Sequence, residues 1–125
     1  MSVLGSSLGG LFSCWAGWTR PDLFNTSVCM SSSFWWNKND FNQTVMSHGD
    51  IRAMPTFYLD SGDTDGDTDI EPATLAVSKH MHALGLNPDL YIDHGGSHNE
   101  RSWGARFDVP LRNLFPPRTL GEAAG

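Results

Sequence analysis

The first residue of chemical interest is Ser7, which lies in a G-x-S-x-G pattern from Gly5 to Gly9. A short apolar run precedes the pattern, and small and apolar residues follow it, as expected for a strand, a tight turn and a helix. A serine on such a turn is exposed and can act as a nucleophile. At a helix N-terminus, Ser7 would also lie where the helix dipole favours developing negative charge.

Two further groups could complete a nucleophilic site. His98 follows a glycine-rich turn, and it can accept a proton near neutral pH because the unperturbed pKa of histidine is about 6.5. An acidic segment lies between Ser7 and His98. A carboxylate from it could fix the imidazole tautomer and stabilise the imidazolium. The order serine, acid, histidine is that of the α/β-hydrolase triad.

Strand and helix signals alternate along the chain and predict the elements that would position these groups. We expect strands near residues 1–5, 25–30, 54–59 and 90–92, and helices near 8–18, 41–47, 72–84 and from 99 onward, with a break at Pro110. This alternation predicts an α/β fold of about four mainly parallel strands, covered by helices on both faces. Loops at the carboxyl ends of the strands would then gather the active residues.

Four separated segments carry a resemblance to a known family. They are Gly5–Gly10, Ser31–Trp36, Tyr58–Gly62, and Gly95–Glu100 with Trp103 and Arg106. Together they resemble the putative esterase family of α/β hydrolases, which includes enterochelin esterase-like and S-formylglutathione hydrolase-like enzymes. The resemblance runs from Ser2 to about Phe115. It implies a carboxylic ester hydrolase that works through an acyl-serine intermediate.

The resemblance also implies roles for individual residues. Ser7 would be the nucleophile and His98 the base, and the acid would lie three residues beyond Gly62, which is Asp65. Three other carboxylates compete for the role of the acid: Asp60, Asp63 and Asp67.

The substrate would be held by groups close to Ser7. The backbone N–H of Leu8 would be one donor of the oxyanion hole. Trp35 and Trp36 could wall an acyl or aryl pocket, or they could form an aromatic plug over the core. The partner expected from this chemistry is a small ester, and nothing in the motifs requires a cofactor or a metal.

Other titratable residues allow different interpretations. His94 is an alternative base, whereas His80 and His82 are expected to be solvated on a helix. His94 and His98 lack a third ligand at a usual zinc spacing. Residues 63–71 carry carboxylates at alternate positions, as hard-cation loops do, so a calcium-binding domain is an alternative function.

A full α/β hydrolase has several strands and a helix before its nucleophile. We therefore expect residues 1–115 to be the carboxyl-terminal half of an α/β-hydrolase domain and residues 116–125 to be a frayed tail. The strand at residues 1–5 would be an exposed edge that could support self-association. One oxyanion donor would be missing, so an inactive or partner-dependent fragment is the alternative to an active enzyme.

Composition excludes several classes of partner. The net charge is −6 and the eight Lys and Arg residues are scattered, which argues against nucleic-acid binding. No apolar run approaches the roughly 20 residues that span a bilayer. The first residues do not resemble a signal peptide, which favours a cytoplasmic location. Cys14 and Cys29 lie among apolar or small neighbours and are expected to be buried free thiols.

Overall fold

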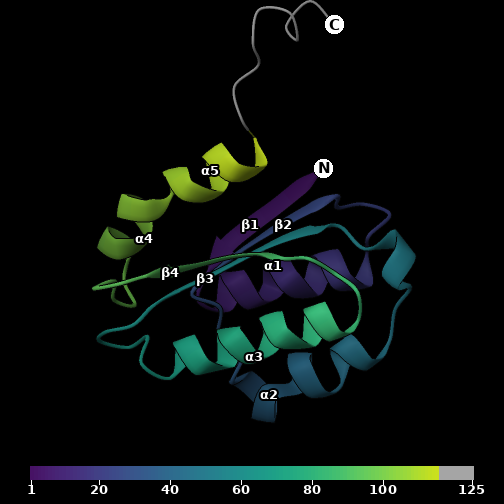
Figure 1. The fold of residues 1–125 in the computed structure, drawn as a ribbon, viewed down its shortest axis with the longest axis horizontal. Coiled ribbons are helices and arrows are strands. Elements are labelled where there is room, and N and C mark those ends of the chain that lie inside the picture. The colour runs from purple at the N-terminus through teal and green to yellow at the C-terminus, as the bar shows by residue number, and fades with distance from the viewer. Residues whose placement is uncertain (116–125) are drawn as a thin grey trace, which may run out of the picture.

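The computed structural model describes residues 1–115, in which strands and helices alternate (Figure 1). The strands are β1 (Ser2–Ser6), β2 (Thr26–Met30), β3 (Thr56–Gly62) and β4 (Asp89–Asp93). The helices are α1 (Leu8–Thr19), α2 (Trp36–Gln43), α3 (Ile70–Ala83), α4 (Glu100–Arg106) and α5 (Asp108–Leu114), with short 3-10 helices at Val45–Ser47 and Ile51–Ala53. The prediction of a frayed tail at 116–125 falls outside the described residues.

The four strands form one parallel sheet in the order β1-β2-β3-β4. Successive side chains of a strand point to opposite faces of the sheet. In β3, Phe57 and Leu59 therefore face one side, while Tyr58 and Asp60 face the other. The expected α/β fold with parallel strands is confirmed.

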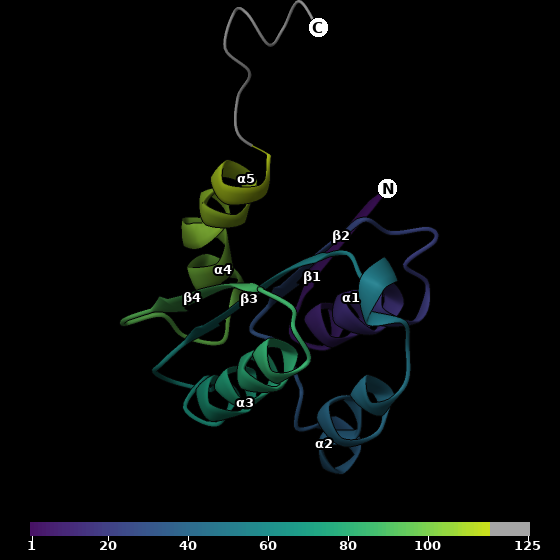
Figure 2. The same ribbon diagram turned by 45° about the vertical axis from the view of Figure 1, so that its right-hand side comes forward.

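Each face of the sheet is covered by its own helices. The larger core contains buried residues of α1, α2 and α3 together with Cys29, Phe57 and Leu59 from the strands. A smaller core on the opposite face joins Val28, Met30 and Tyr58 to residues of α4 and α5. Figure 2 shows α1 and α3 on one side of the sheet and α4 and α5 on the other.

The sequence predicted that the two cysteines are free thiols, and this prediction is wrong because they form a disulfide. Cys14 of α1 and Cys29 of β2 are bonded, with their Cα atoms 5.9 Å apart, and both are fully buried. The pairing follows from the β1–α1–β2 crossover, which lays α1 on the face of β2 that carries Cys29. Local sequence could not show this, because it is tertiary packing that brings together residues 15 positions apart.

Two helices differ from their expected form. The helix expected at 41–47 begins at Trp36, and residues 37–39 have positive φ angles of 51 to 60°, so its first turn is not regular. The last helix breaks at Phe107 and not at Pro110. Pro110 is the third residue of α5, where a backbone N–H has no acceptor within the helix, so its ring is tolerated there.

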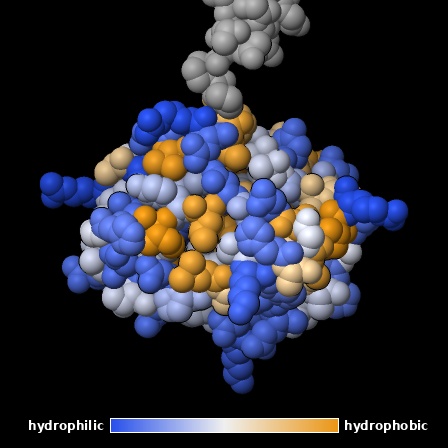
Figure 3. All heavy atoms as spheres, viewed as in Figure 1, coloured by the Kyte–Doolittle hydropathy of each residue, from blue (hydrophilic) through white to orange (hydrophobic). Residues whose placement is uncertain are grey.

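The surface retains apolar side chains in separate patches, as Figure 3 shows for the face seen in Figure 1. Within residues 1–115, no helix combines the length and the apolar character needed to cross a bilayer. In this part of the chain β1 pairs with β2 alone and forms one edge of the sheet, with Leu4 half exposed. Self-association through this edge stays a prediction.

The two outer glycines of the G-x-S-x-G pattern should respond differently to alanine. A Cβ on Gly5 would overlap the carbonyl group of Gly9, whereas a Cβ on Gly9 would meet open space. We expect Gly5→Ala to lower the free energy of unfolding by about 1–3 kcal/mol because backbone must move. Gly9→Ala should change it by less than about 1 kcal/mol and favour the helix. Urea unfolding of both variants measures the difference, and equal stabilities would contradict this packing.

Candidate active site

Ser7 is the single residue between β1 and α1, and its backbone is strained. Its φ and ψ are 60° and −123°, which a non-glycine residue rarely adopts. Three hydrogen bonds hold it: its N–H donates to the Met30 carbonyl at 3.0 Å, and its carbonyl accepts from the N–H groups of Leu11 and Ser33, each at 3.1 Å. Strain of this kind persists only where surrounding contacts fix the backbone.

His98 approaches Ser7 from the loop between β4 and α4. Its Nε2 lies 2.8 Å from the Ser7 Oγ, and its Nδ1 lies 2.7 Å from Oδ1 of Asp67. The side chain is 24% exposed, and its ring stands edge-on to Trp103 with the centroids 5.1 Å apart. With the proton on Nδ1 donated to the carboxylate, Nε2 is free to accept the proton of Ser7.

The carboxylate beside His98 therefore belongs to Asp67, where the sequence had suggested Asp65. Asp67 is fully buried, whereas Asp65 is exposed and instead accepts the backbone N–H of His98 through its carbonyl at 2.9 Å. Gly66 lies between them with a φ of 83°, and a Cβ there would press on the His98 side chain. This left-handed residue turns the chain so that Asp67 points inward.

The other two competing acids have partners of their own. Asp60 is buried on β3, where it accepts two hydrogen bonds from Arg106, each 3.1 Å, and one from the Tyr58 hydroxyl at 2.8 Å. Burial and the charge of Asp60 raise the pKa of the Tyr58 phenol, which keeps it protonated as a donor. Asp63 pairs with His94 at 3.0 Å.

The remaining histidines lie away from Ser7. The side chain of His94 is 86% exposed and its Nδ1 contacts Asp63, so it is not placed as a base for the serine. His82 is exposed as expected, whereas His80 is half-buried and its Nδ1 lies 2.7 Å from the amide oxygen of Asn42.

The acidic segment does not form a metal site in the described structure. The carboxylates of Asp67 and Asp63 diverge, the first toward His98 and the second toward His94. Across residues 1–115, no three His, Cys, Asp or Glu side chains are grouped in a way that could hold a metal ion. The geometry thus gives no support to the calcium alternative or to a zinc site at His94 and His98.

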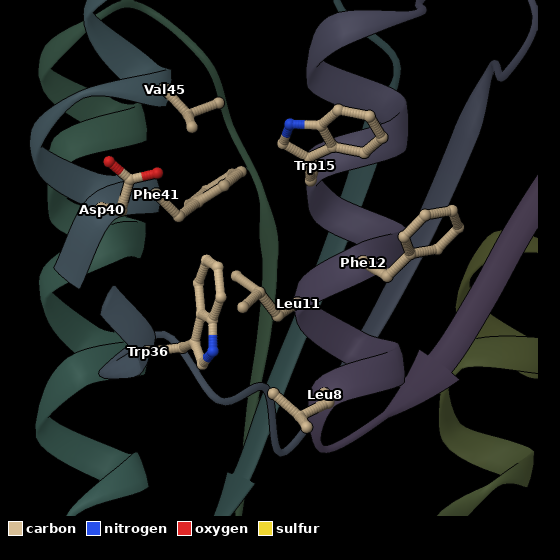
Figure 4. A pocket seen from close by; sticks show the side chains of 8 residues that line it. All are labelled: Leu8, Leu11, Phe12, Trp15, Trp36, Asp40, Phe41 and Val45. Carbon is tan, nitrogen blue, oxygen red and sulfur yellow. The ribbon is translucent and has the colours of Figure 1, made fainter. Parts of the chain in front are cut away.

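An apolar pocket of about 520 Å³ begins one residue after Ser7, between α1 and α2 (Figure 4). Figure 4 shows side chains of the two helices on opposite sides of it, among them Trp36 and Leu11. Its lining residues are Leu8, Leu11, Phe12, Trp15, Trp36, Asp40, Phe41 and Val45. Trp36 therefore lines this pocket, whereas Trp35 is 53% exposed and lies outside the lining.

The backbone beside Ser7 also offers a donor. Leu8 is the first residue of α1, and the N–H at this position of a helix has no acceptor within the helix. It is therefore available to an anionic oxygen next to Ser7.

A parallel α/β sheet with a serine on the turn after a strand is the arrangement of an esterase-type hydrolase. Residues 1–114 match the family described as putative esterase. The chain belongs to this family. At the level of sequence, no curated protein matches it.

Solved structures share the fold. The enterochelin esterase from Shigella flexneri superposes with a TM-score of 0.79 at 21% identity, over 93% of this chain and 30% of that one. A ferulic acid esterase superposes with a TM-score of 0.76 at 18% identity, over 90% of this chain and 49% of that one. The siderophore hydrolase EstB from Aspergillus nidulans superposes with a TM-score of 0.63 at 20% identity, over 94% of this chain and 50% of that one. The chain thus spans half or less of the length of these proteins.

The pair of His94 and Asp63 makes a prediction about titration. The hydrogen bond and charge of Asp63 raise the pKa of His94, and the hydrogen bonds from His94 and from the Gly95 N–H lower that of Asp63. The raised pKa of His94 stabilises the fold below the unfolded value of about 6.5, and this contribution is lost as pH rises through the folded value. NMR titration should show the His94 pKa falling in Asp63→Asn. Asp65→Asn is the matched control, and a similar fall there would contradict the assignment.

Proposed function

We propose that this chain carries the reacting residues of a serine esterase, with Ser7 as nucleophile, His98 as base and Asp67 as acid. The observation that carries the proposal is the continuous hydrogen-bonded path from the Ser7 Oγ through His98 to the buried Asp67, with distances of 2.8 and 2.7 Å. Asp67 takes the role that the resemblance had suggested for Asp65.

The reaction follows from these contacts. The Ser7 Oγ attacks the ester carbonyl while His98 Nε2 takes its proton, and Asp67 stabilises the resulting imidazolium. The tetrahedral intermediate collapses, His98 protonates the leaving alkoxide, and an acyl-Ser7 remains. Water then attacks the acyl group with His98 again as base, and the carboxylic acid leaves as Ser7 regains its proton.

Charge on the substrate oxygen would be stabilised first by the Leu8 N–H. Hydrolases of this type use a second donor from another loop. Because this chain covers 30 to 50% of the length of these solved relatives, we place that donor in a segment beyond residues 1–115 or in a partner chain. Losing one such donor lowers turnover by about 100- to 1,000-fold, so residues 1–115 without that second donor would hydrolyse esters slowly.

The substrate class proposed is a small carboxylic ester with an apolar acyl group. The pocket beside Leu8 is lined almost entirely by apolar and aromatic side chains, and Asp40 is its one acidic residue. Relatives are described as acting on ferulic acid esters, enterobactin and siderophores, so phenolic acyl esters are the first compounds to assay.

The proposed roles predict the effect of single substitutions. A fluorophosphonate probe should label Ser7, and Ser7→Ala should abolish both labelling and hydrolysis of p-nitrophenyl esters. Asp67→Asn should lower kcat by about 1,000- to 10,000-fold because it disturbs the imidazole tautomer. Asp65→Asn, two residues away on the same loop, should keep kcat within about three-fold of the wild-type value, because the carboxylate of Asp65 does not contact His98.

The outcomes separate the proposal from its alternatives. Labelling with turnover supports the esterase. Labelling without turnover indicates a fragment that needs a partner for the full reaction. An unlabelled wild-type chain without hydrolysis indicates an inactive one, and equal losses in the Asp65 and Asp67 variants would refute Asp67 as the acid.

The two tryptophans provide a test of the pocket. Trp36→Ala should raise KM for a p-nitrophenyl ester with an aromatic acyl group by about ten-fold, since roughly 1–3 kcal/mol of apolar contact is lost, and should change KM for the acetate little. Trp35→Ala is the matched control, because Trp35 lies outside the lining. If both esters respond equally to Trp36→Ala, the pocket does not hold the acyl group.

A further inference from the structure

A buried polar path lies behind Asp67 that the proposed reaction does not use. We infer that Ser31 is a positioning residue, whose hydroxyl is oriented by Arg106 and fixes the Asp67 carboxylate against His98. The catalytic consequence rests on the proposed function, whereas the effect on the histidine can be measured without it.

The direction of each proton in this path is determined by the donors available. Nη2 of Arg106 lies 2.5 Å from the Ser31 Oγ, and a guanidinium can only donate, so the hydroxyl oxygen accepts. The one hydroxyl proton is then donated to Oδ2 of Asp67, at 2.8 Å. The Gly62 N–H donates to the same oxygen at 2.7 Å. Oδ1 is thereby left for the Nδ1–H of His98.

Arg106 is itself held rigidly. It is 3% exposed, and it donates to both carboxylate oxygens of Asp60 and to Asp93 at 3.2 Å. Burial opposes its charge, but the hydrogen bonds and charges of Asp60 and Asp93 outweigh burial and raise its pKa. The guanidinium is therefore a permanent donor that joins the end of α4 to Asp60 within β3 and to Asp93 at the end of β4.

The backbone of Ser31 is also fixed in an unusual conformation. Its φ is 40°, in the left-handed region that glycine adopts most easily. Its N–H donates to the carbonyl and to the carboxylate of Asp60, at 3.0 and 2.9 Å. Strained residues held in this way collect at functional sites. Here the conformation directs the hydroxyl of Ser31 toward Asp67, and glycine would have no side chain to place there.

The first experiment separates the hydroxyl from the backbone. Ser31→Ala should lower kcat by about ten-fold or more with KM changed less than two-fold, since a hydrogen bond to a charged group is lost. Ser31→Gly also lacks the hydroxyl but relaxes the backbone, and it should show the same loss. The control is Ser32→Ala, because Ser32 is equally buried and its hydroxyl has no hydrogen-bond partner among residues 1–115. Wild-type kcat in Ser31→Ala overturns the inference.

The second measurement does not depend on activity. The 15N chemical shifts of the His98 ring, measured on the neutral imidazole, report which nitrogen carries the proton. We expect the Nδ1–H tautomer to dominate in the wild type and in Ser32→Ala, and a mixture in both Ser31 variants, with circular dichroism showing that each is folded. An unchanged tautomer in Ser31→Ala overturns the inference. If the wild type neither reacts with the probe nor hydrolyses esters, the proposed function fails, and the tautomer still decides the role of Ser31.

Discussion

The buried ion pair of Arg106 and Asp60 is the interaction on which the site depends most. It joins α4 to the centre of the sheet, and α4 begins directly after the loop that carries His98. Removing charges from water is costly, and the cost is offset here because Tyr58, Ser31 and Asp93 complete the hydrogen bonds of the pair. Removing one partner of such a pair costs about 3–5 kcal/mol, so the position of His98 and the stability of the fold are linked.

The parallel sheet supplies the second constraint. The carboxyl ends of β1, β3 and β4 meet at one edge, and the loops after them carry Ser7, Asp67 and His98. Two of these loops are tied together, because the Gly96 carbonyl accepts the N–H groups of Asp63 and Thr64 at 3.1 and 3.0 Å. The loops that carry Asp67 and His98 are thus held relative to each other by backbone contacts, independently of the hydrogen bond between the two side chains.

The sequence predicted the features that depend on local residue patterns, and it did not predict the side-chain contacts that depend on tertiary packing. The strands and the parallel fold followed from hydrophobic periodicity and from the glycines and prolines between the elements. The pairing of His98 with Ser7 was suggested by the order of the motifs and by the family resemblance. The contact of His98 with the Asp67 carboxylate, rather than that of Asp65, was not apparent from the sequence, because the left-handed Gly66 sets the direction of the loop. The Cys14–Cys29 bond and the contact of Arg106 with Ser31 join positions that only packing brings together, and no local signal marks either one.

The two strained serines, Ser7 and Ser31, lie in segments that are joined by backbone hydrogen bonds. Ser7 follows β1 and Ser31 follows the neighbouring strand β2, and both have positive φ angles. The Ser7 N–H donates to Met30, the residue before Ser31, and the Ser7 carbonyl accepts from Ser33. The residues on both sides of Ser31 therefore bond to the backbone of Ser7. A shift in the segment after β2 would move Ser7 as well as the Ser31 hydroxyl that contacts Asp67, so Ser7 and Asp67 share one backbone framework although 60 positions separate them in the sequence.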